Sequence, residues 1–220
     1  MNKTTELYDL TKTLAGEYLA GFEYPWQALP GIGDLIEKLS GELTDEYRQY
    51  APGVWVHQSA VIAPSALIEP PCIIGAETEV RHCAFIRGCT LVGAGCVVGN
   101  SVELKNAILF DGVQVPHFNY VGDSILGYKS HLGAGAVTSN FKLDGSLVTI
   151  REGNERYETG LQKVGALLGD RVEVGCNSVL NPGTMIGRDT VVYPGNSIRG
   201  VVPANSIVKG NGRIFGKEQR

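Results

Sequence analysis

An apolar residue recurs at every sixth position over much of this chain. The series runs without a break from Val56 to Phe110 and returns in later stretches that end at Leu132 and Ile198. A fixed period of six residues is typical of a parallel β-solenoid, in which three hexads, each a short strand and a corner, close a triangular coil. The pattern therefore predicts an all-β solenoid of hexapeptide repeats over residues 51–210.

The other hexad positions carry residues suited to a tight coil. The residue directly after the apolar position is often glycine, as at Gly75 and Gly99, and the fourth residue after it is usually small. Glycine there allows either a positive φ or a close approach of two backbones. The cysteines also fall on hexad positions, and we expect them to be reduced packing residues rather than metal ligands or disulfides. They are Cys72, Cys83, Cys89, Cys96 and Cys176.

Composition excludes several classes of function. The net charge is −4 with no run of Lys or Arg, whereas binding to nucleic acid needs clustered cations. No apolar stretch approaches the ~20 residues of a membrane helix, and the first 25 residues lack the apolar run of a signal peptide. We therefore expect a cytoplasmic protein with neither nucleic acid nor membrane as a partner.

Two segments depart from the hexad pattern. Residues 1–50 have the spacing of two short amphipathic helices, which predicts a helical N-terminal cap over an open end of the solenoid. Residues 141–167 read as an inserted hairpin, either at a functional face or as a surface decoration. The tail, residues 211–220, either extends freely or lies along the solenoid.

Two cations stand out on one predicted face. Arg87 and Lys105 are eighteen residues apart, so they stack on neighbouring turns, and each directly follows an inward aliphatic residue. Glu103 flanks the same inward position as Lys105 and also points outward. Such a cluster suits a phosphate group, but a solvated ladder of ion pairs has the same pattern.

His117 lies where the hexad breaks, directly after a proline. Histidine transfers protons near neutral pH, so His117 is the natural candidate for a general base. The other histidines make weaker cases. His57 and His82 occupy ordinary outward positions, and His131 lies nearer the candidate site.

The segment from Arg87 to Asn140 carries a family resemblance through RGCTLVGAGCVVGNSVELKNA, VPHFNYVGDSILG and HLGAGAVTSN. It resembles the acetyltransferase domain of the bifunctional enzyme that makes UDP-N-acetylglucosamine, in the hexapeptide-repeat acyltransferase superfamily. The resemblance implies that the solenoid is a left-handed β-helix and that the protein is a homotrimer with sites between subunits.

The resemblance also implies roles for individual residues. Arg87 and Lys105 would hold the sugar phosphate, and His117 would take the proton of the attacking amine. Glu103 would be the second catalytic residue and would help to position the amino sugar. Acetyl-CoA would be the co-substrate, and acyl transfer would need no metal. The remaining implied contacts are Tyr120 and Asn140 with the amino sugar, and Ala134 and Cys176 with acetyl-CoA.

Three positions depart from the family pattern and leave the acceptor open. Phe141 replaces a tyrosine, His131 an asparagine, and Cys176 a serine. The family's bifunctional members also carry a nucleotidyltransferase domain where this chain has its helical segment. Without a loop to cradle nucleotide phosphates, we expect no nucleotidyltransferase activity.

The leading interpretation is a CoA-dependent N-acetyltransferase that acts on an amino-sugar phosphate or a nucleotide-linked amino sugar, related to UDP-N-acetylglucosamine biosynthesis. Backbone N–H groups of the turn 133–135 would stabilise the oxyanion. One alternative is a non-catalytic, sugar-nucleotide-binding or regulatory trimer. Another is a zinc hydratase of the γ-carbonic anhydrase type, which the scattered histidines favour least.

Overall fold

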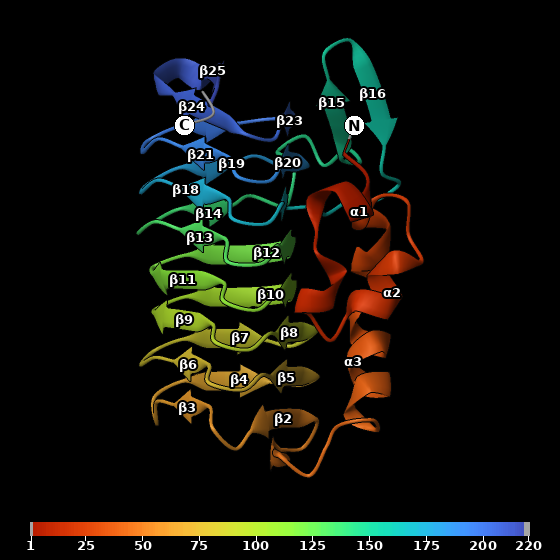
Figure 1. Ribbon diagram of the computed structural model, residues 1–220, viewed down its shortest axis with the longest axis vertical. Coiled ribbons are helices and arrows are strands. Elements are labelled where there is room, and N and C mark those ends of the chain that lie inside the picture. The colour runs from red at the N-terminus through yellow and green to blue at the C-terminus, as the bar shows by residue number, and fades with distance from the viewer. Residues whose placement is uncertain (1, 218–220) are drawn as a thin grey trace.

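The computed structural model describes residues 2–217 as a left-handed parallel β-helix flanked by helices (Figure 1). Strands of successive turns pair in parallel, so each turn, or rung, supplies up to three short strands. We call one side the covered face. Its strands are β2 (Val54–His57), β5 (Cys72–Ile74), β8 (Thr90–Val92), the second halves of β10 (Glu103–Leu109) and β12 (Tyr120–Leu126), β17 (Ala166–Leu168), β20 (Thr184–Ile186) and β23 (Val201–Val202).

The other two sides are the open face and the third face. The open face consists of β4 (Leu67–Glu69), β7 (Phe85–Arg87), the first halves of β10 and β12, β14 (Val137–Thr138), β19 (Val179–Leu180) and β22 (Ser197–Ile198). The third face consists of β3 (Val61–Ile62), β6 (Glu79–Val80), β9 (Val97–Asn100), β11 (Gln114–His117), β13 (His131–Leu132), β18 (Glu173–Val174), β21 (Val191–Val192) and β24 (Ser206–Lys209).

The apolar hexad positions form the interior of the solenoid. Nearly all of them are buried, and those on the first rungs are only partly exposed. The register shortens at two places. Val92 pairs with Leu109 and Leu109 with Leu126, so these two rungs contain seventeen residues each, and the last rung, where Ile186 pairs with Val202, contains sixteen. Phe110 therefore lies in a turn rather than at the strand position that the period predicts. It is still fully buried, with its ring centroid 5.0 Å from that of Tyr8.

The corner glycines are needed for close backbone approach, one of the two reasons the sequence suggests. A Cβ at Gly75 would lie 2.5 Å from the carbonyl carbon of Gly93, and one at Gly99 would lie 1.7 Å from the Pro116 oxygen. Neither glycine has a positive φ. Left-handed backbone occurs instead at other corner positions, several of them Asn or Asp, which tolerate that conformation.

The cysteines do not share one environment. All five are free; Cys72 and Cys96 are buried, and burial raises the pKa of the Cys96 thiol to about 12. Cys83 and Cys176 are exposed at corners. The prediction that all five are packing residues is therefore wrong for these two. The buried cysteines lie four residues after an inward aliphatic residue, whereas Cys83 lies three residues and Cys176 two residues after one, on the outer side of a corner.

The N-terminal helices lie along the covered face (Figure 1). The Asp170 backbone N–H donates to the Leu7 carbonyl oxygen at 3.0 Å, joining helix to solenoid. We expected these helices over an open end, and that placement is wrong. The outward residues of this face are apolar and need cover along its length. The helices are α1 (Thr4–Leu7), η1 (Leu10–Lys12), α2 (Gly16–Ala20), η2 (Pro25–Gly31) and α3 (Ile32–Ser40).

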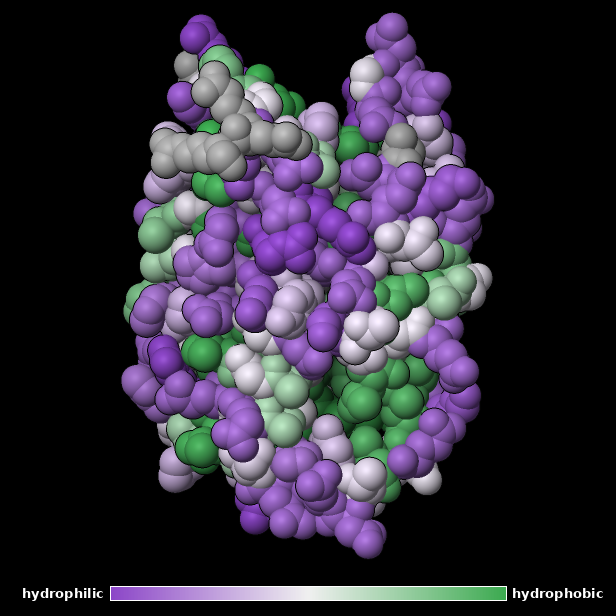
Figure 2. All heavy atoms as spheres, viewed as in Figure 1, coloured by the Kyte–Doolittle hydropathy of each residue, from purple (hydrophilic) through white to green (hydrophobic). Residues whose placement is uncertain are grey.

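Figure 2 shows apolar atoms gathered beside α3, while hydrophilic atoms dominate the rest of this view. The first rung is flanked by β1 (Tyr47–Ala51), which pairs antiparallel with β2. At the other end, β25 (Arg213–Gly216) pairs antiparallel with β24, so this part of the tail lies along the solenoid. Residues 218–220 of the predicted tail lie outside the described residues. Within residues 2–217, no helix combines the length and apolar character required to cross a membrane.

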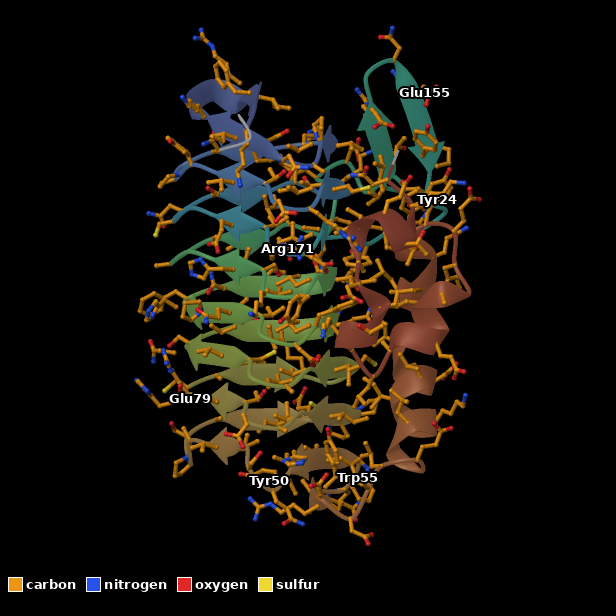
Figure 3. The ribbon with its side chains drawn as sticks, in the orientation of Figure 1. Tyr24, Tyr50, Trp55, Glu79, Glu155 and Arg171 are labelled. Atoms are coloured by element: carbon orange, nitrogen blue, oxygen red, sulfur yellow. The ribbon has the colours of Figure 1, made fainter. Side chains whose placement is uncertain are left out.

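The inserted segment leaves the solenoid after β14 and returns at β17. Its strands β15 (Thr149–Glu152) and β16 (Glu155–Glu158) pair antiparallel. The hairpin projects beside the helices, and the ring of Tyr157 lies 6.1 Å from that of Tyr24, which Figure 3 labels below Glu155 at the hairpin. Val148 and Ile150 are fully buried, so the base of the insertion is part of the core.

Candidate functional site

Five of the predicted site residues gather on the open face. Arg87 ends β7, Glu103 and Lys105 lie at the start of β10, Tyr120 begins β12, and Asn140 follows β14. The register pairs Phe85 with Glu103 and Glu103 with Tyr120. Because neighbouring strands lie about 4.8 Å apart, the group spans a few adjacent rungs. Sequence spacing and strand alternation are sufficient to place it.

Each of the two predicted phosphate-binding cations has a carboxylate beside it. The Arg87 Nη1 atom donates to the Glu103 Oε1 atom at 2.7 Å, and this hydrogen bond is the main cause of a raised pKa for the Arg87 guanidinium. The Lys105 Nζ atom lies 3.8 Å from the Asp123 Oδ2 atom. The ion-pair ladder therefore exists, and a phosphate ligand would have to share these cations with carboxylates.

Tyr120 and Asn140 are joined across the same site. The Asn140 amide nitrogen donates to the Tyr120 hydroxyl oxygen at 3.2 Å. Burial is the main cause of a raised pKa for the Tyr120 phenol, and the nearby Asp123 carboxylate adds to the shift. Tyr120 is therefore a neutral hydroxyl at physiological pH, able to donate a hydrogen bond to a ligand.

The other three predicted residues form a column that we call the histidine corner: His117, Ala134 and Cys176. The Gly135 N–H donates to the His117 carbonyl oxygen at 3.0 Å, and the Asn177 N–H donates to the Ala134 carbonyl oxygen at 2.8 Å. These bonds place the three residues on consecutive rungs at one corner. The candidate base and the candidate CoA residues thus share one edge of the solenoid.

A two-residue turn separates the histidine corner from the open face. Phe118 has a φ of 53° and is 59% exposed, whereas Asn119 is buried and donates to the carbonyl oxygens of Gly133 and Ala136 at 2.8 and 3.0 Å. The His117 ring is exposed and makes no hydrogen bond within residues 2–217. Within the described residues, the His117 ring is therefore not hydrogen-bonded to the cluster of Arg87 and Lys105.

The turn at residues 133–135 has less hydrogen-bonding capacity than its glycines suggest. The Gly133 N–H already donates to Val174 at 2.7 Å, and the Gly135 N–H donates to His117. The Ala134 N–H donates no hydrogen bond to any of the described residues. The expectation of several oxyanion donors there is thus reduced to one.

Two of the other histidines have side-chain partners elsewhere. The His131 Nδ1 atom lies 2.8 Å from the Glu173 Oε2 atom, and the His57 Nδ1 atom lies 2.9 Å from the Ser59 hydroxyl oxygen. Within residues 2–217, no three His, Cys, Asp or Glu side chains cluster as a metal site would require.

Asp123 is a site residue that the sequence analysis missed. Its side chain is 8% exposed, and it accepts hydrogen bonds from both Asn106 and Asn140. Asn106 and Asp123 occupy corresponding corners of neighbouring rungs, with φ values of 48° and 47°. Asn106 and Asp123 are seventeen residues apart, so a search for residues that repeat every six positions does not relate them. An Asn and an Asp at this spacing are the sequence signal that could have identified Asp123.

The insertion adds a cavity of about 370 Å³ next to Asn140. Phe141 and Lys142 of the insertion face Asn181 and Arg199 of the solenoid across it. Phe141 also forms an isolated bridge with Lys163, which closes the neck of the insertion. The insertion therefore lies at the open face, close to the candidate site.

Comparison with known proteins identifies relatives of this chain. The Bifunctional protein GlmU of Methanococcus maripaludis is 30% identical over 196 residues, covering 87% of this chain and 47% of that protein. The Bifunctional protein GlmU of Trichormus variabilis is 37% identical over 193 residues, covering 80% of this chain and 39% of the relative. The chain thus spans less than half the length of these relatives.

The other comparisons are less informative. No protein-family model matches the chain. The acetyltransferase domain of PglB from Neisseria gonorrhoeae, solved with acetyl coenzyme A, is 19% identical over 72% of this chain and 55% of that one, with a TM-score of 0.34, too low to support a comparison of function. The hexad pattern, the β-helix and the similarity to the GlmU proteins show that this chain belongs to the hexapeptide-repeat acyltransferase superfamily.

Proposed function

We propose that this protein transfers an acetyl group from acetyl-CoA to the amine of an amino sugar that carries a phosphate or a nucleotide. The observation that carries the proposal is the cluster of Arg87, Glu103, Lys105, Tyr120 and Asn140 on the open face of a chain related to the GlmU proteins. The GlmU relatives are named as bifunctional proteins, and the part of them that matches this chain is the acetyltransferase solenoid.

The charges of the cluster suit an amino-sugar phosphate. Arg87 and Lys105 offer guanidinium and ammonium donors to a phosphate. Glu103, the Asn140 amide and the Tyr120 hydroxyl offer acceptors to an amine and to sugar hydroxyl groups. A ligand with one anionic and one cationic end matches this mixed arrangement better than an anion alone, because each cation already has a carboxylate neighbour.

In the proposed reaction, His117 accepts a proton from the amine while the nitrogen attacks the thioester carbonyl carbon. The resulting oxyanion is stabilised by the Ala134 N–H. The carbon–sulfur bond then breaks, and the CoA thiolate leaves and takes up the proton from the histidine. An amide and free CoA are the products, so atoms and charge balance without a metal.

The position of His117 supports a homotrimer. The histidine corner of one copy would complete the site by facing the open face of a neighbour. Apolar side chains suited to such contact are exposed on both surfaces: Phe118 at the corner is 59% exposed, and Leu67 on the open face is 56% exposed. We expect light scattering to give three times the mass of one chain.

A thiol-release assay tests this function. Acetyl-CoA would be supplied with glucosamine-1-phosphate, other amino-sugar phosphates and UDP-linked amino sugars. We expect turnover, and a decrease of about 10²- to 10⁴-fold in kcat for His117→Ala, the usual contribution of a general base. Because the His117 side chain is exposed, the variant should unfold at the wild-type temperature. Full activity in the folded variant would rule out His117 as the base.

A second candidate function is sugar-nucleotide binding without catalysis. The exposed thiol of Cys176 and the place of Phe141 at the neck of the insertion favour it, since both alter the polar surface beyond the phosphate cations. Calorimetry that detects binding of the sugar phosphate but not of CoA, together with no turnover, would select this alternative.

A further inference from the structure

We propose that Asp123 is a positioning residue that fixes the orientation of Asn140 and the charge balance of Lys105, and so determines how the site receives an amine. The inference deepens the proposed function and rests on it for the identity of the ligand. Asp123 is 8% exposed, and its partners are Asn106, Asn140 and Lys105. A buried carboxylate requires such partners, because an unpaired charge away from water is strongly unfavourable.

The first consequence concerns the side-chain amide of Asn140. An ionised carboxylate only accepts hydrogen bonds, so the NH₂ end of Asn140 must face Asp123. The same nitrogen donates to Tyr120 Oη, and both of its protons are then used. The Asn140 Oδ1 atom has no hydrogen-bond donor within residues 2–217 and remains available to a ligand. Asp123 thereby makes Asn140 an acceptor, which is the partner that an amine N–H needs.

The second consequence concerns Lys105. The distance of 3.8 Å between its Nζ atom and the Asp123 Oδ2 atom exceeds hydrogen-bond length. Asp123 therefore compensates the charge of Lys105 on the rung next to Arg87 without using the ammonium donors. Those three donors remain available for a phosphate oxygen. The pairing thus holds Lys105 at the site and leaves it able to bind.

The third observation connects Asp123 to the helices on the covered face. Asn106 donates one hydrogen bond to the Asp123 Oδ1 atom at 2.9 Å and another to the Leu29 carbonyl oxygen of η2 at 3.3 Å. The carboxylate is therefore held from the helical side as well as from the solenoid. Asn106 and Asp123 both require left-handed backbone, which Asn and Asp adopt more readily than most residues.

The substitution Asp123→Asn tests the proposal, with Asp189→Asn as the matched control. Both aspartates lie at corners with left-handed backbone, and both pair with a cation, but Asp189 pairs with Arg171 away from the site. Asparagine keeps the size and backbone conformation while removing the acceptor-only character. In the variant, the Asn140 amide is free to rotate, and its Oδ1 atom is no longer directed outward.

For Asp123→Asn we expect kcat for the amine acceptor to fall by roughly tenfold to a hundredfold, as for the loss of a hydrogen bond to a charged group. The KM for a phosphorylated acceptor should not rise, because the variant also removes a negative charge near the phosphate. Asp189→Asn should match the wild type. A kcat within twofold of wild type, or an increased KM with a lowered unfolding temperature, would overturn the positioning role.

A second measurement does not depend on turnover. The side-chain NH₂ signals of Asn140, assigned by their loss in Asn140→Asp, should exchange slowly with solvent in the wild type. Exchange at least tenfold faster in Asp123→Asn, but not in Asp189→Asn, would support the proposal even if the wild type transfers no acyl group. Unchanged exchange would refute it, whatever the result of the activity assay.

Discussion

Strand β10 passes from the open face to the covered face, and its two halves differ in what lies outside them. Lys105, in the first half, remains 27% exposed beside other charged groups. Ile108, in the second half, is fully buried under the helices. Both residues point away from the interior, and both lie in the same parallel register. The strand backbone is therefore the same in both halves. Whether helices lie outside a face determines whether its outward side chains are buried or available to a ligand.

The burial patterns of neighbouring strands support this comparison. Strands β5, β8, β17 and β20 of the covered face are buried at all three positions, whereas β19 and β22 of the open face alternate between exposed and buried. Full burial requires apolar groups on both sides of the strand. The covered face thus contributes stability, while the open face leaves polar side chains available to a ligand.

The largest expected effect tests the covered face. Ile108→Ala should lower the free energy of unfolding by about 2–5 kcal/mol, because it removes buried methyl groups and leaves a cavity under the helices. Urea unfolding followed by circular dichroism measures the change, and Ile108→Val should cost only about 0.5–1.5 kcal/mol. Equal, small losses for both variants would show that the helices do not pack tightly on this strand.

An intermediate effect tests the open face. Arg87→Met removes a cation and leaves Glu103 to repel a phosphate, so the KM for a phosphorylated acceptor should rise roughly tenfold or more. The unfolding temperature should hardly change, because Arg87 is exposed. Arg81→Met is the matched control, since Arg81 makes a similar ion pair with Glu79 at 2.9 Å. A similar rise in both variants would argue against a phosphate site at Arg87.

The smallest effect concerns a corner that belongs to neither face. The hydrogen bonds from Arg171 hold the pKa of Asp189 below its ordinary value of 3.8. A carboxyl group with a lowered folded-state pKa stabilises the fold above that value, and the contribution is lost as the pH falls through the folded-state pKa. Asp189→Asn should therefore be less stable than wild type by under about 1 kcal/mol near neutral pH, since the pair is exposed.

Unfolding measured over a series of pH values tests that expectation. The difference in unfolding free energy between wild type and Asp189→Asn should shrink as the pH falls below 4, and it should shrink with added salt at neutral pH. A difference that grows on acidification would show that Asp189 is protonated in the fold at a higher pH than in the unfolded chain.

The sequence predicts the open-face cluster better than the rest of the site. Residues eighteen apart that flank inward aliphatic residues must stack outward on one face, and Arg87, Glu103 and Lys105 follow this rule. Asp123 escapes the same reasoning because it lies at a corner, where side-chain direction depends on the left-handed backbone rather than on alternation. The cysteines show how much one position matters at a corner, since Cys83, three residues after an inward aliphatic residue, is exposed, and Cys96, four residues after one, is buried.

The period of six determines the β-helix, its interior and the outward side of each strand, because strand alternation and close rung spacing leave few other ways to bury those residues. Only the tertiary structure decides where the helices lie, that Leu109 rather than Phe110 continues the register, and that Asp123 meets Asn106, Asn140 and Lys105. These outcomes depend on contacts between segments far apart in the chain and on single-residue changes at corners, which a repeat pattern does not encode.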